Sequence, residues 1–190
     1  DSPRFRDPAL RDALLRGLAH WHAAHPRCDN WWYNQIFAPQ RLGETLLLAQ
    51  HGGLPLEALP KGLLERWRAE GGDPARKTGT TTGSNLVNIA AHCCYRALLT
   101  QDEPALRAAL GRLFAPLALT DAEGLQRDLS YHQHGPQLYL GNYGYDWLEL
   151  NAAWLARLRG TDLLPPPERA ALVPAYALGA YFPAIRGQWY

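Results

Sequence analysis

The sequence predicts an all-α protein assembled from helical hairpins. Apolar residues recur every three to four positions in seven segments, and most of these segments begin at a capping residue or end at a Gly or Pro turn. Patterns typical of strands are almost absent. Antiparallel helix pairs joined by such turns, with polar and aromatic residues collected on loops, favour a solenoid or toroid of hairpins over a four-helix bundle.

The first half of the chain predicts four helices. Asp7 is a suitable N-cap, and Pro8 follows at the first helical position, where a missing N–H is tolerated. Pro39 marks the start of the second helix, and the second and third helices both end at Gly-Gly pairs. The expected ranges are residues 7–22, 39–50, 56–70 and 84–99.

The second half predicts three more helices, over residues 102–115, 145–159 and 167–181. Asp102 caps the first of them, and a run of three prolines precedes the last. Two long irregular segments, residues 27–35 and 116–144, interrupt the helical pattern. Irregular segments of this length in a compact helical domain are usually functional, so we expect the site residues there. No linker composition divides the chain, which predicts a single domain.

The composition excludes several classes of function. The 190 residues are 47% hydrophobic, enough for a sizeable core, and the net charge of +1 with scattered arginines argues against a nucleic-acid partner. No apolar run approaches the roughly 20 residues that span a bilayer, and the first residues lack a basic-then-apolar leader, so we expect no membrane partner and a soluble chain. Cys28, Cys93 and Cys94 fit neither a disulfide framework nor a zinc site, and we expect buried, reduced thiols.

Residues 131–145 form the most informative segment, because they combine histidines, tyrosines and glycines in a pattern that fits neither helix nor strand. Polar aromatic residues on an irregular, glycine-punctuated loop are typical of a cleft. A tyrosine held near an uncharged histidine, such as Tyr143 near His134, can transfer protons. His132 and His134 alternate as metal ligands do, but no third ligand lies nearby in sequence, which argues against a metal.

Two other segments carry polar chemistry. Trp31 and Trp32 adjoin Asn34 and Gln35, and indole faces among side-chain amides are typical of sugar-binding platforms, although the indoles can equally anchor the loop to the core. Asn85 begins a helix, where it or its neighbour Ser84 can act as the N-cap. Alternatively, the Asn85 amide faces a substrate carboxylate at the positive end of the helix.

Taken together in this order, residues 30–36, 82–85 and 133–137 with the Tyr143-Gly144 pair resemble the polysaccharide lyases of family 8, which include chondroitin AC, hyaluronate and xanthan lyases. The resemblance extends from Asp7 to Tyr190. It corresponds to part of the family's N-terminal (α/α) toroid, and it implies an incomplete, truncated toroid whose C-terminal remainder and β-sandwich domains are absent. The family's Gly-Arg-x-x-Ser-Arg type motif is also missing, so we expect the isolated chain to be inactive.

The resemblance implies eliminative cleavage of a uronic-acid polysaccharide, of the chondroitin or hyaluronan type, without cofactor or metal. Tyr143 then acts as general base and acid, while Asn85 and His134 neutralise the uronate carboxylate. The implied substrate-binding residues are Trp31, Trp32, Asn34, Gln35 and Gln133. We expect Trp31, Asn85, His134 and Tyr143 to approach one cleft. The resemblance further implies a secreted or periplasmic bacterial protein that acts as a monomer.

Two other functions remain open from the sequence. One is a non-catalytic helical carbohydrate-binding module that keeps the aromatic platform. The other is a glycoside hydrolase on an (α/α) toroid, which requires two carboxylates across a cleft. The irregular segments offer mainly Asp29 and Asp128, with no evident pairing.

Overall fold

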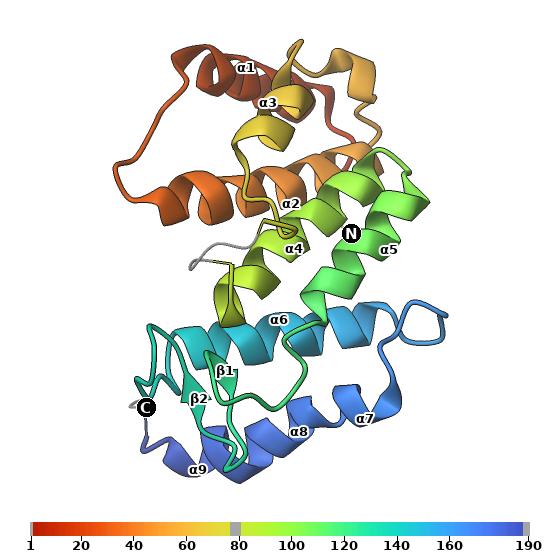
Figure 1. Ribbon diagram of the computed structural model, residues 1–190. Helices are drawn as coiled ribbons and strands as arrows, with labels where there is room; N and C mark the ends of the chain where they lie inside the picture. Colours follow the sequence, from red (N-terminus) through yellow and green to blue (C-terminus); the bar gives the residue numbers. More distant parts are fainter. Residues whose placement is uncertain (1, 77–80, 188–190) are drawn as a thin grey trace. The chain divides into compact units, whose positions relative to one another are not determined.

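The structure is a computed structural model that describes residues 2–76 and 81–187 (Figure 1). The chain divides into two compact units. Unit 1 comprises Asp1–Gly72 and Tyr95–Asp102, and unit 2 comprises Asp73–Cys94 and Glu103–Tyr190. The described residues are mostly helical, which confirms the predicted all-α class. None of the helices in the described ranges is both long and apolar enough to cross a membrane.

Unit 1 contains α1 (Pro8–Ala24), the π-helical turn η1 (Tyr33–Phe37), α2 (Ala38–His51), the 3₁₀ turn η2 (Leu56–Ala58) and α3 (Leu63–Glu70). The predicted cap of α1 is confirmed, because Asp7 Oδ1 accepts hydrogen bonds from the N–H groups of Ala9 and Leu10 at 2.8 and 3.4 Å. A hydrogen bond from Arg4, together with these N–H groups, lowers the pKa of Asp7. The core of the unit includes Ile36, Leu46 and Leu63, each at most 1% exposed.

The helix predicted over residues 39–50 is present as α2, but helical structure begins well before Pro39. The helix begins at Trp31 and runs through the π-helical turn η1 into α2. Proline has no N–H, so Pro39 cannot donate to the Gln35 carbonyl four residues earlier. That carbonyl accepts instead from the Gly72 N–H at 3.1 Å. The helix therefore widens into a π-helical turn at this point and does not end. The segment expected to be irregular is therefore helical from Trp31 onward.

The predicted third helix, residues 56–70, is split into η2 and α3. Pro60 lies between them and cannot supply an N–H to the preceding turn, and Gly62 takes a left-handed conformation with φ of 82°. The two residues explain why a continuous helical pattern of apolar residues does not give a continuous helix.

Unit 2 holds most of α4 (Gly83–Leu99), then α5 (Glu103–Leu113), α6 (Tyr143–Arg157), α7 (Pro167–Ala170), α8 (Leu172–Tyr176), the π-helical turn η3 (Ala177–Tyr181) and α9 (Phe182–Ala184). The predicted final helix, residues 167–181, is thus divided into α7, α8 and η3, and α9 follows it. Pro174 lies within α8 and cannot donate to the carbonyl four residues earlier, and η3 precedes Pro183 as η1 precedes Pro39. The core includes Tyr131, Trp147 and Tyr176, all 0% exposed.

A short hairpin holds the only two β-strands among the described residues. Its strands β1 (Gly124–Leu125) and β2 (Tyr131–His132) are antiparallel, with Leu125 opposite Tyr131 (Figure 1). The hairpin folds the long segment between α5 and α6 back on itself, and β2 packs on α6. It thereby delivers the segment after His132 to the start of α6.

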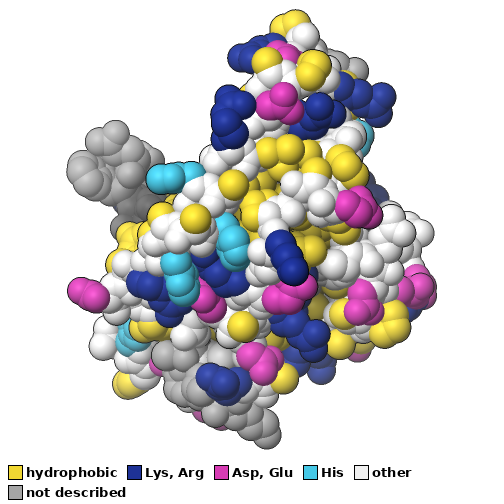
Figure 2. All heavy atoms as spheres, turned by 90° about the horizontal axis from the view of Figure 1, so that it is seen from above, with side chains coloured by type: hydrophobic (Ala, Val, Ile, Leu, Met, Phe, Trp, Pro, Cys, Tyr) yellow, Lys and Arg dark blue, Asp and Glu magenta, His cyan; other side chains and the backbone are white. Residues whose placement is uncertain are grey.

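The cysteines follow the expectation only in part. Cys93 and Cys94 are buried within α4, and burial, followed by the charge of Cys93, raises the pKa of the Cys94 thiol. Cys28 is exposed, which contradicts the expected burial, because it precedes the first turn of the helix that begins at Trp31. On the face shown in Figure 2, basic and acidic side chains are interspersed, as the net charge of +1 suggests.

Candidate active site

His134 and Tyr143 are in direct contact in unit 2. Nε2 of His134 lies 3.0 Å from the Tyr143 hydroxyl oxygen, and the two rings meet edge to face with centroids 5.0 Å apart. Tyr139 completes an aromatic group, because its ring lies edge to face with both of the other rings, at 6.0 Å from His134 and 5.0 Å from Tyr143. The pairing of histidine and tyrosine predicted for this loop is therefore present as a hydrogen bond.

The backbone around the pair is unusual. Tyr143 is the first residue of α6, and Asn142 before it has a positive φ of 53°. His134 also has a positive φ, of 58°, in an exposed turn. Residues other than glycine persist in this region only where the surrounding structure fixes them, and such positions cluster at functional sites.

The environment makes the Tyr143 phenol harder to ionise. Burial, followed by the nearby charges of Tyr139, Asp146 and Glu123, raises the pKa of Tyr143 above the ordinary value for tyrosine. A tyrosine that takes a proton at neutral pH therefore needs a cation to offset these effects.

Asn85 lies in the first turn of α4 and is 3% exposed. The helix begins at Gly83, so neither Ser84 nor Asn85 occupies the N-cap position that the sequence allowed. Asn85 Oδ1 is buried and has no hydrogen-bond partner within residues 2–76 and 81–187. A buried carbonyl oxygen without a donor is costly, and a bound group that donates a hydrogen bond is one way to relieve the cost.

Gln133 connects the first turn of α4 to the loop of His134. Its side chain is 1% exposed, and its Oε1 accepts from the Ser84 N–H at 3.2 Å. Gly83 makes this approach possible: it has φ of 47°, and a β-carbon there would lie 2.4 Å from Gln133 Oε1. The structure therefore links the segment of Asn85 to that of His134.

Glu123 lies within the same network, and the sequence analysis did not identify it. Its carboxylate accepts hydrogen bonds from Gln133 Nε2 at 2.6 Å, from the Gly135 N–H at 2.8 Å and from the Thr82 hydroxyl. A single glutamate in an irregular segment has no sequence pattern that sets it apart. Only the folded hairpin brings it beside these donors.

Trp31 and Trp32 lie in unit 1, both half-buried. Trp32 stacks on Phe37 with centroids 5.8 Å apart and an interplanar angle of 30°, and it meets Tyr33 edge to face at 5.3 Å. Tyr33 and Phe37 are 46% and 42% exposed. The aromatic surface thus extends one turn beyond the pair of indoles that the sequence suggested.

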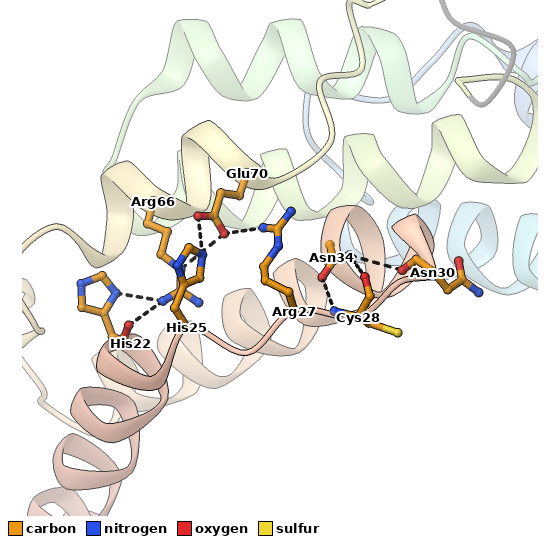
Figure 3. A network of polar contacts seen from close by, with 8 residues as sticks. All are labelled: His22, His25, Arg27, Cys28, Asn30, Asn34, Arg66 and Glu70. Carbon is orange, nitrogen blue, oxygen red and sulfur yellow. Dashed lines mark hydrogen bonds and ion pairs between the residues drawn. The ribbon is translucent and has the colours of Figure 1, made fainter.

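The loop before these aromatics is tightly fixed, as Figure 3 shows. Asn34 Oδ1 accepts from the Cys28 N–H at 3.0 Å, and its Nδ2 donates to the carbonyls of Cys28 and Asn30 at 2.6 and 3.3 Å. Asn30 Oδ1 in turn accepts from the Trp32 N–H at 3.0 Å, as an N-cap does. Both polar atoms of the Asn34 amide therefore bind the loop backbone.

A second network in Figure 3 fixes the start of the same loop. Glu70 of α3 pairs with His25 at 2.7 Å and with Arg27 at 2.9 Å. Arg66 lies 3.4 Å from Glu70 and donates to the His22 carbonyl at 2.7 Å. These contacts hold the chain that leads from α1 to the aromatic residues.

The remaining candidates have other surroundings. His132 Nε2 lies 3.3 Å from the Ser130 hydroxyl, and no cluster of three or more His, Cys, Asp or Glu side chains in the described ranges is arranged to hold a metal. Asp128 accepts from the N–H and hydroxyl of Ser130, and these bonds lower its pKa. A carboxyl stabilised in its ionised form is a poor general acid, which does not favour a glycoside hydrolase built on Asp128.

Comparison with known proteins gives the family. The model of the polysaccharide lyase family 8 N-terminal alpha-helical domain matches residues 1–189. The chain belongs to polysaccharide lyase family 8. This confirms the resemblance drawn from the ordered motifs around Trp31, Asn85 and His134.

Individual chondroitinases are similar to this chain in both sequence and structure. The chain is 39% identical over 191 residues to chondroitinase AC of Pedobacter heparinus, and the aligned region covers all of this chain and 26% of that protein. A structure of a chondroitinase AC lyase studied as enzyme–oligosaccharide complexes matches with a TM-score of 0.88 and 39% identity, over 98% of this chain and 27% of that one.

More distant structures share the fold. The chondroitin AC lyase of Streptomyces coelicolor A3, in complex with chondroitin sulphate, matches with a TM-score of 0.79 and 27% identity, over 95% of this chain and 25% of that one. The Paenibacillus xanthan lyase, at 21% identity and a TM-score of 0.74, supports the fold alone and covers 95% of this chain and 17% of the other. The chain thus spans about a quarter of the chondroitinases that it matches.

Proposed function

We propose that this chain contributes catalytic residues to a polysaccharide lyase that cleaves a uronic-acid polysaccharide of the chondroitin type by β-elimination. The observation that carries the proposal is the hydrogen bond between His134 and Tyr143, on a loop tied to the first turn of α4 that bears Asn85. Membership of lyase family 8 and 39% identity to a chondroitinase AC support it.

The proposed chemistry follows from the substrate. The C5 proton of a uronate is acidic because it is next to the carboxylate, and its removal expels the oxygen at C4 and leaves an unsaturated sugar. Negative charge then grows on the carboxylate. Asn85 and His134 stabilise that charge by donating hydrogen bonds, which is the kind of electrostatic contribution that usually dominates enzymatic rate enhancement.

Tyr143 takes the C5 proton and returns a proton to the leaving oxygen. The raised pKa of Tyr143 disfavours the phenolate form that takes the C5 proton, so the site needs a cationic group beside the phenol. We propose that an arginine beyond this chain supplies it, and that the described residues form part of an (α/α) toroid completed by other parts of a longer protein. The coverage of about a quarter of the chondroitinases supports this view.

The substrate-binding residues in this proposal are Trp31 and Trp32, which stack on sugar rings, with Gln133 near the carboxylate subsite. Asn34 and Gln35 adjoin the two indoles in the sequence, and Asn34 contributes by fixing the loop through its bonds to Cys28 and Asn30. We further propose a secreted or periplasmic monomer that acts on chondroitin or hyaluronan without a cofactor.

The deciding experiment uses the complete product of the gene that encodes this chain, which we call the extended chain. The extended chain is incubated with chondroitin sulfate, hyaluronan and xanthan, and the ultraviolet absorbance of the new double bond is recorded. Elimination gives absorbing products. New reducing ends without absorbance would instead indicate a hydrolase, and binding without any product would indicate a carbohydrate-binding module.

A further inference from the structure

Glu123 joins the two segments that carry the proposed carboxylate-binding residues. Its Oε1 accepts from the Gly135 N–H at 2.8 Å, and its Oε2 accepts from Gln133 Nε2 at 2.6 Å and from the Thr82 hydroxyl. Gln133 and Gly135 flank His134 in the sequence, and Thr82 lies three positions before Asn85. The Glu123 carboxylate therefore binds the residues on either side of His134 and a residue shortly before Asn85.

Three hydrogen-bond donors converge on the Glu123 carboxylate. An amide N–H, a backbone N–H and a hydroxyl converge on a group that can only accept, and hydrogen bonds to a charged acceptor are about twice as strong as neutral ones. Gln133 extends the connection, because its Oε1 accepts from the Ser84 N–H at 3.2 Å. The contacts form a continuous chain from the start of α4 to the turn at His134.

The turn at His134 needs such support. His134 has a positive φ of 58°, which is strained for a residue with a side chain, and it is exposed. Burial of its own side chain therefore does not hold it in this conformation. The hydrogen bond from the next residue, Gly135, to Glu123 fixes the peptide that follows the imidazole. Gln133 fixes the residue before it.

We propose that Glu123 is a positioning residue, which holds His134 and Asn85 in the relative placement that a single uronate carboxylate requires. The inference rests on the proposed function. Glu123 acts through the loop and the helix start and does not itself contact the substrate. It is thus distinct from the roles assigned to His134, Asn85 and Tyr143.

Glutamine cannot replace Glu123 without loss. If its amide oxygen faces Gln133 and Thr82, its NH₂ group faces the Gly135 N–H; if it is turned over, two NH₂ groups oppose each other. Either orientation sets a donor against a donor while keeping the size of the side chain. Asp121→Asn is a matched control, because Asp121 lies in the same segment, is exposed and pairs only loosely with Arg127 at 3.7 Å.

The test compares Glu123→Gln and Asp121→Asn with the parent, all as the extended chain acting on chondroitin sulfate. For Glu123→Gln we expect kcat to fall about 10- to 100-fold with KM changed by less than about threefold, because misplaced groups lose transition-state contacts more than ground-state binding. Asp121→Asn should keep the parental kcat. Parental kcat in Glu123→Gln, or an equal loss in Asp121→Asn, overturns the proposal.

A second readout does not depend on turnover. Nitrogen NMR of the His134 imidazole reports its hydrogen bond to Tyr143, and we expect this signal to change in Glu123→Gln but not in Asp121→Asn. If the parent makes no unsaturated product, the proposed function fails, whereas this measurement still decides the positioning role. An unchanged imidazole signal in Glu123→Gln overturns that role whatever the activity.

Should Glu123→Gln fail to fold, as judged by circular dichroism, Thr82→Val provides the alternative. It removes one donor to Glu123 and preserves the side-chain shape. We expect kcat to fall by about two- to tenfold, with the imidazole signal shifted in the same direction. Parental kcat together with a parental imidazole signal in Thr82→Val overturns the proposal.

Discussion

The Tyr143 hydroxyl oxygen and His134 Nε2, from residues nine positions apart in the sequence, lie 3.0 Å apart and are joined by a hydrogen bond. The direction of that hydrogen bond depends on the tautomer of the imidazole. When the phenol donates, the unprotonated Nε2 of His134 accepts. When Nε2–H donates, the bond stabilises the phenolate form of Tyr143. The same contact therefore bears on both the ionisation of Tyr143 and the orientation of His134.

Replacing Tyr143 by phenylalanine tests the proposed base. The change removes the hydroxyl and keeps the ring that packs against His134 and Tyr139. We expect release of unsaturated product by the extended chain to fall by a factor of about 10²–10⁴, the usual contribution of a positioned acid or base, while equilibrium binding of oligosaccharide is retained.

Tyr139→Phe is the matched control for this prediction, since its ring also meets His134 and Tyr143. It should keep turnover within about fivefold of the parent, because it leaves the hydrogen bond between His134 and Tyr143 intact. Turnover in Tyr143→Phe within a few-fold of the parent would assign the proton transfer to another group, with His134 the first to examine.

Asp146 gives a prediction about pH. Burial, followed by the charge of Glu149, raises the pKa of Asp146 from 3.8 to about 6. A carboxyl whose pKa is raised by folding favours the folded state below about pH 4, and this contribution is lost as the pH rises through 6. Ionised Asp146 therefore lowers the free energy of unfolding at pH 7.

Asp146→Asn should accordingly increase the free energy of unfolding at pH 7 by roughly 1 kcal/mol, a value reduced for the partial exposure of the side chain, and should change it little at pH 4. Urea denaturation of the chain at both pH values measures this, with Asp121→Asn as the exposed control. An equal effect at the two pH values would exclude ionisation of Asp146 as the cause. The variant should also make Tyr143 easier to ionise, because the charge of Asp146 contributes to its raised pKa.

The helices could be predicted from the sequence where caps and periodicity agree, as at Asp7 and Pro8. The prediction was incomplete where proline has two possible roles. Pro39 was expected to start a helix, but the Gly72 N–H satisfies the carbonyl that it frees, so the helix continues through it. That partner lies more than thirty positions away and has no signal in a local pattern.

The site shows the same limit. The contact between His134 and Tyr143 was predictable as a pairing of residue types on one loop. Glu123 was not, because its partners are Thr82, far away in the sequence, and Gln133 and Gly135 beside His134, and these meet it only when the β1–β2 hairpin forms. Local sequence specifies the reactive groups here, and the tertiary fold specifies what holds them.

The aromatic surface of unit 1 gives a prediction about binding. If Trp31 and Trp32 stack on sugar rings, Trp31→Ala and Trp32→Ala should each weaken oligosaccharide binding to the extended chain by about 1–3 kcal/mol, by analogy with other stacking platforms. Titration calorimetry measures the affinity, and the melting temperature of each variant is the control. A lowered melting temperature with unchanged affinity would mean that the indole anchors the loop to the core. For Trp32, whose ring stacks on Phe37, this outcome has a specific structural basis.

Gly144 gives the last prediction, because it follows Tyr143 at a point where α6 has no room for a side chain. A β-carbon on Gly144 would lie 2.3 Å from the Tyr176 hydroxyl oxygen and 2.6 Å from the Tyr139 carbonyl. We expect Gly144→Ala to destabilise the chain by about 1–3 kcal/mol through overpacking, measured by urea denaturation. In the extended chain it should also lower turnover, because α6 must shift and carry Tyr143 with it. Gly111→Ala is the control: nothing lies within 4 Å of the added carbon in α5, so this change should stabilise the chain by about 0.5–1 kcal/mol.

A double variant tests the cause of the overpacking. Combining Gly144→Ala with Tyr176→Phe removes the nearer clash, but it also removes the hydrogen bond from Tyr176 to the Leu140 carbonyl. The double variant should therefore be more stable than the sum of the two single changes implies, and strict additivity would show that the Tyr176 hydroxyl is not what excludes a side chain at position 144.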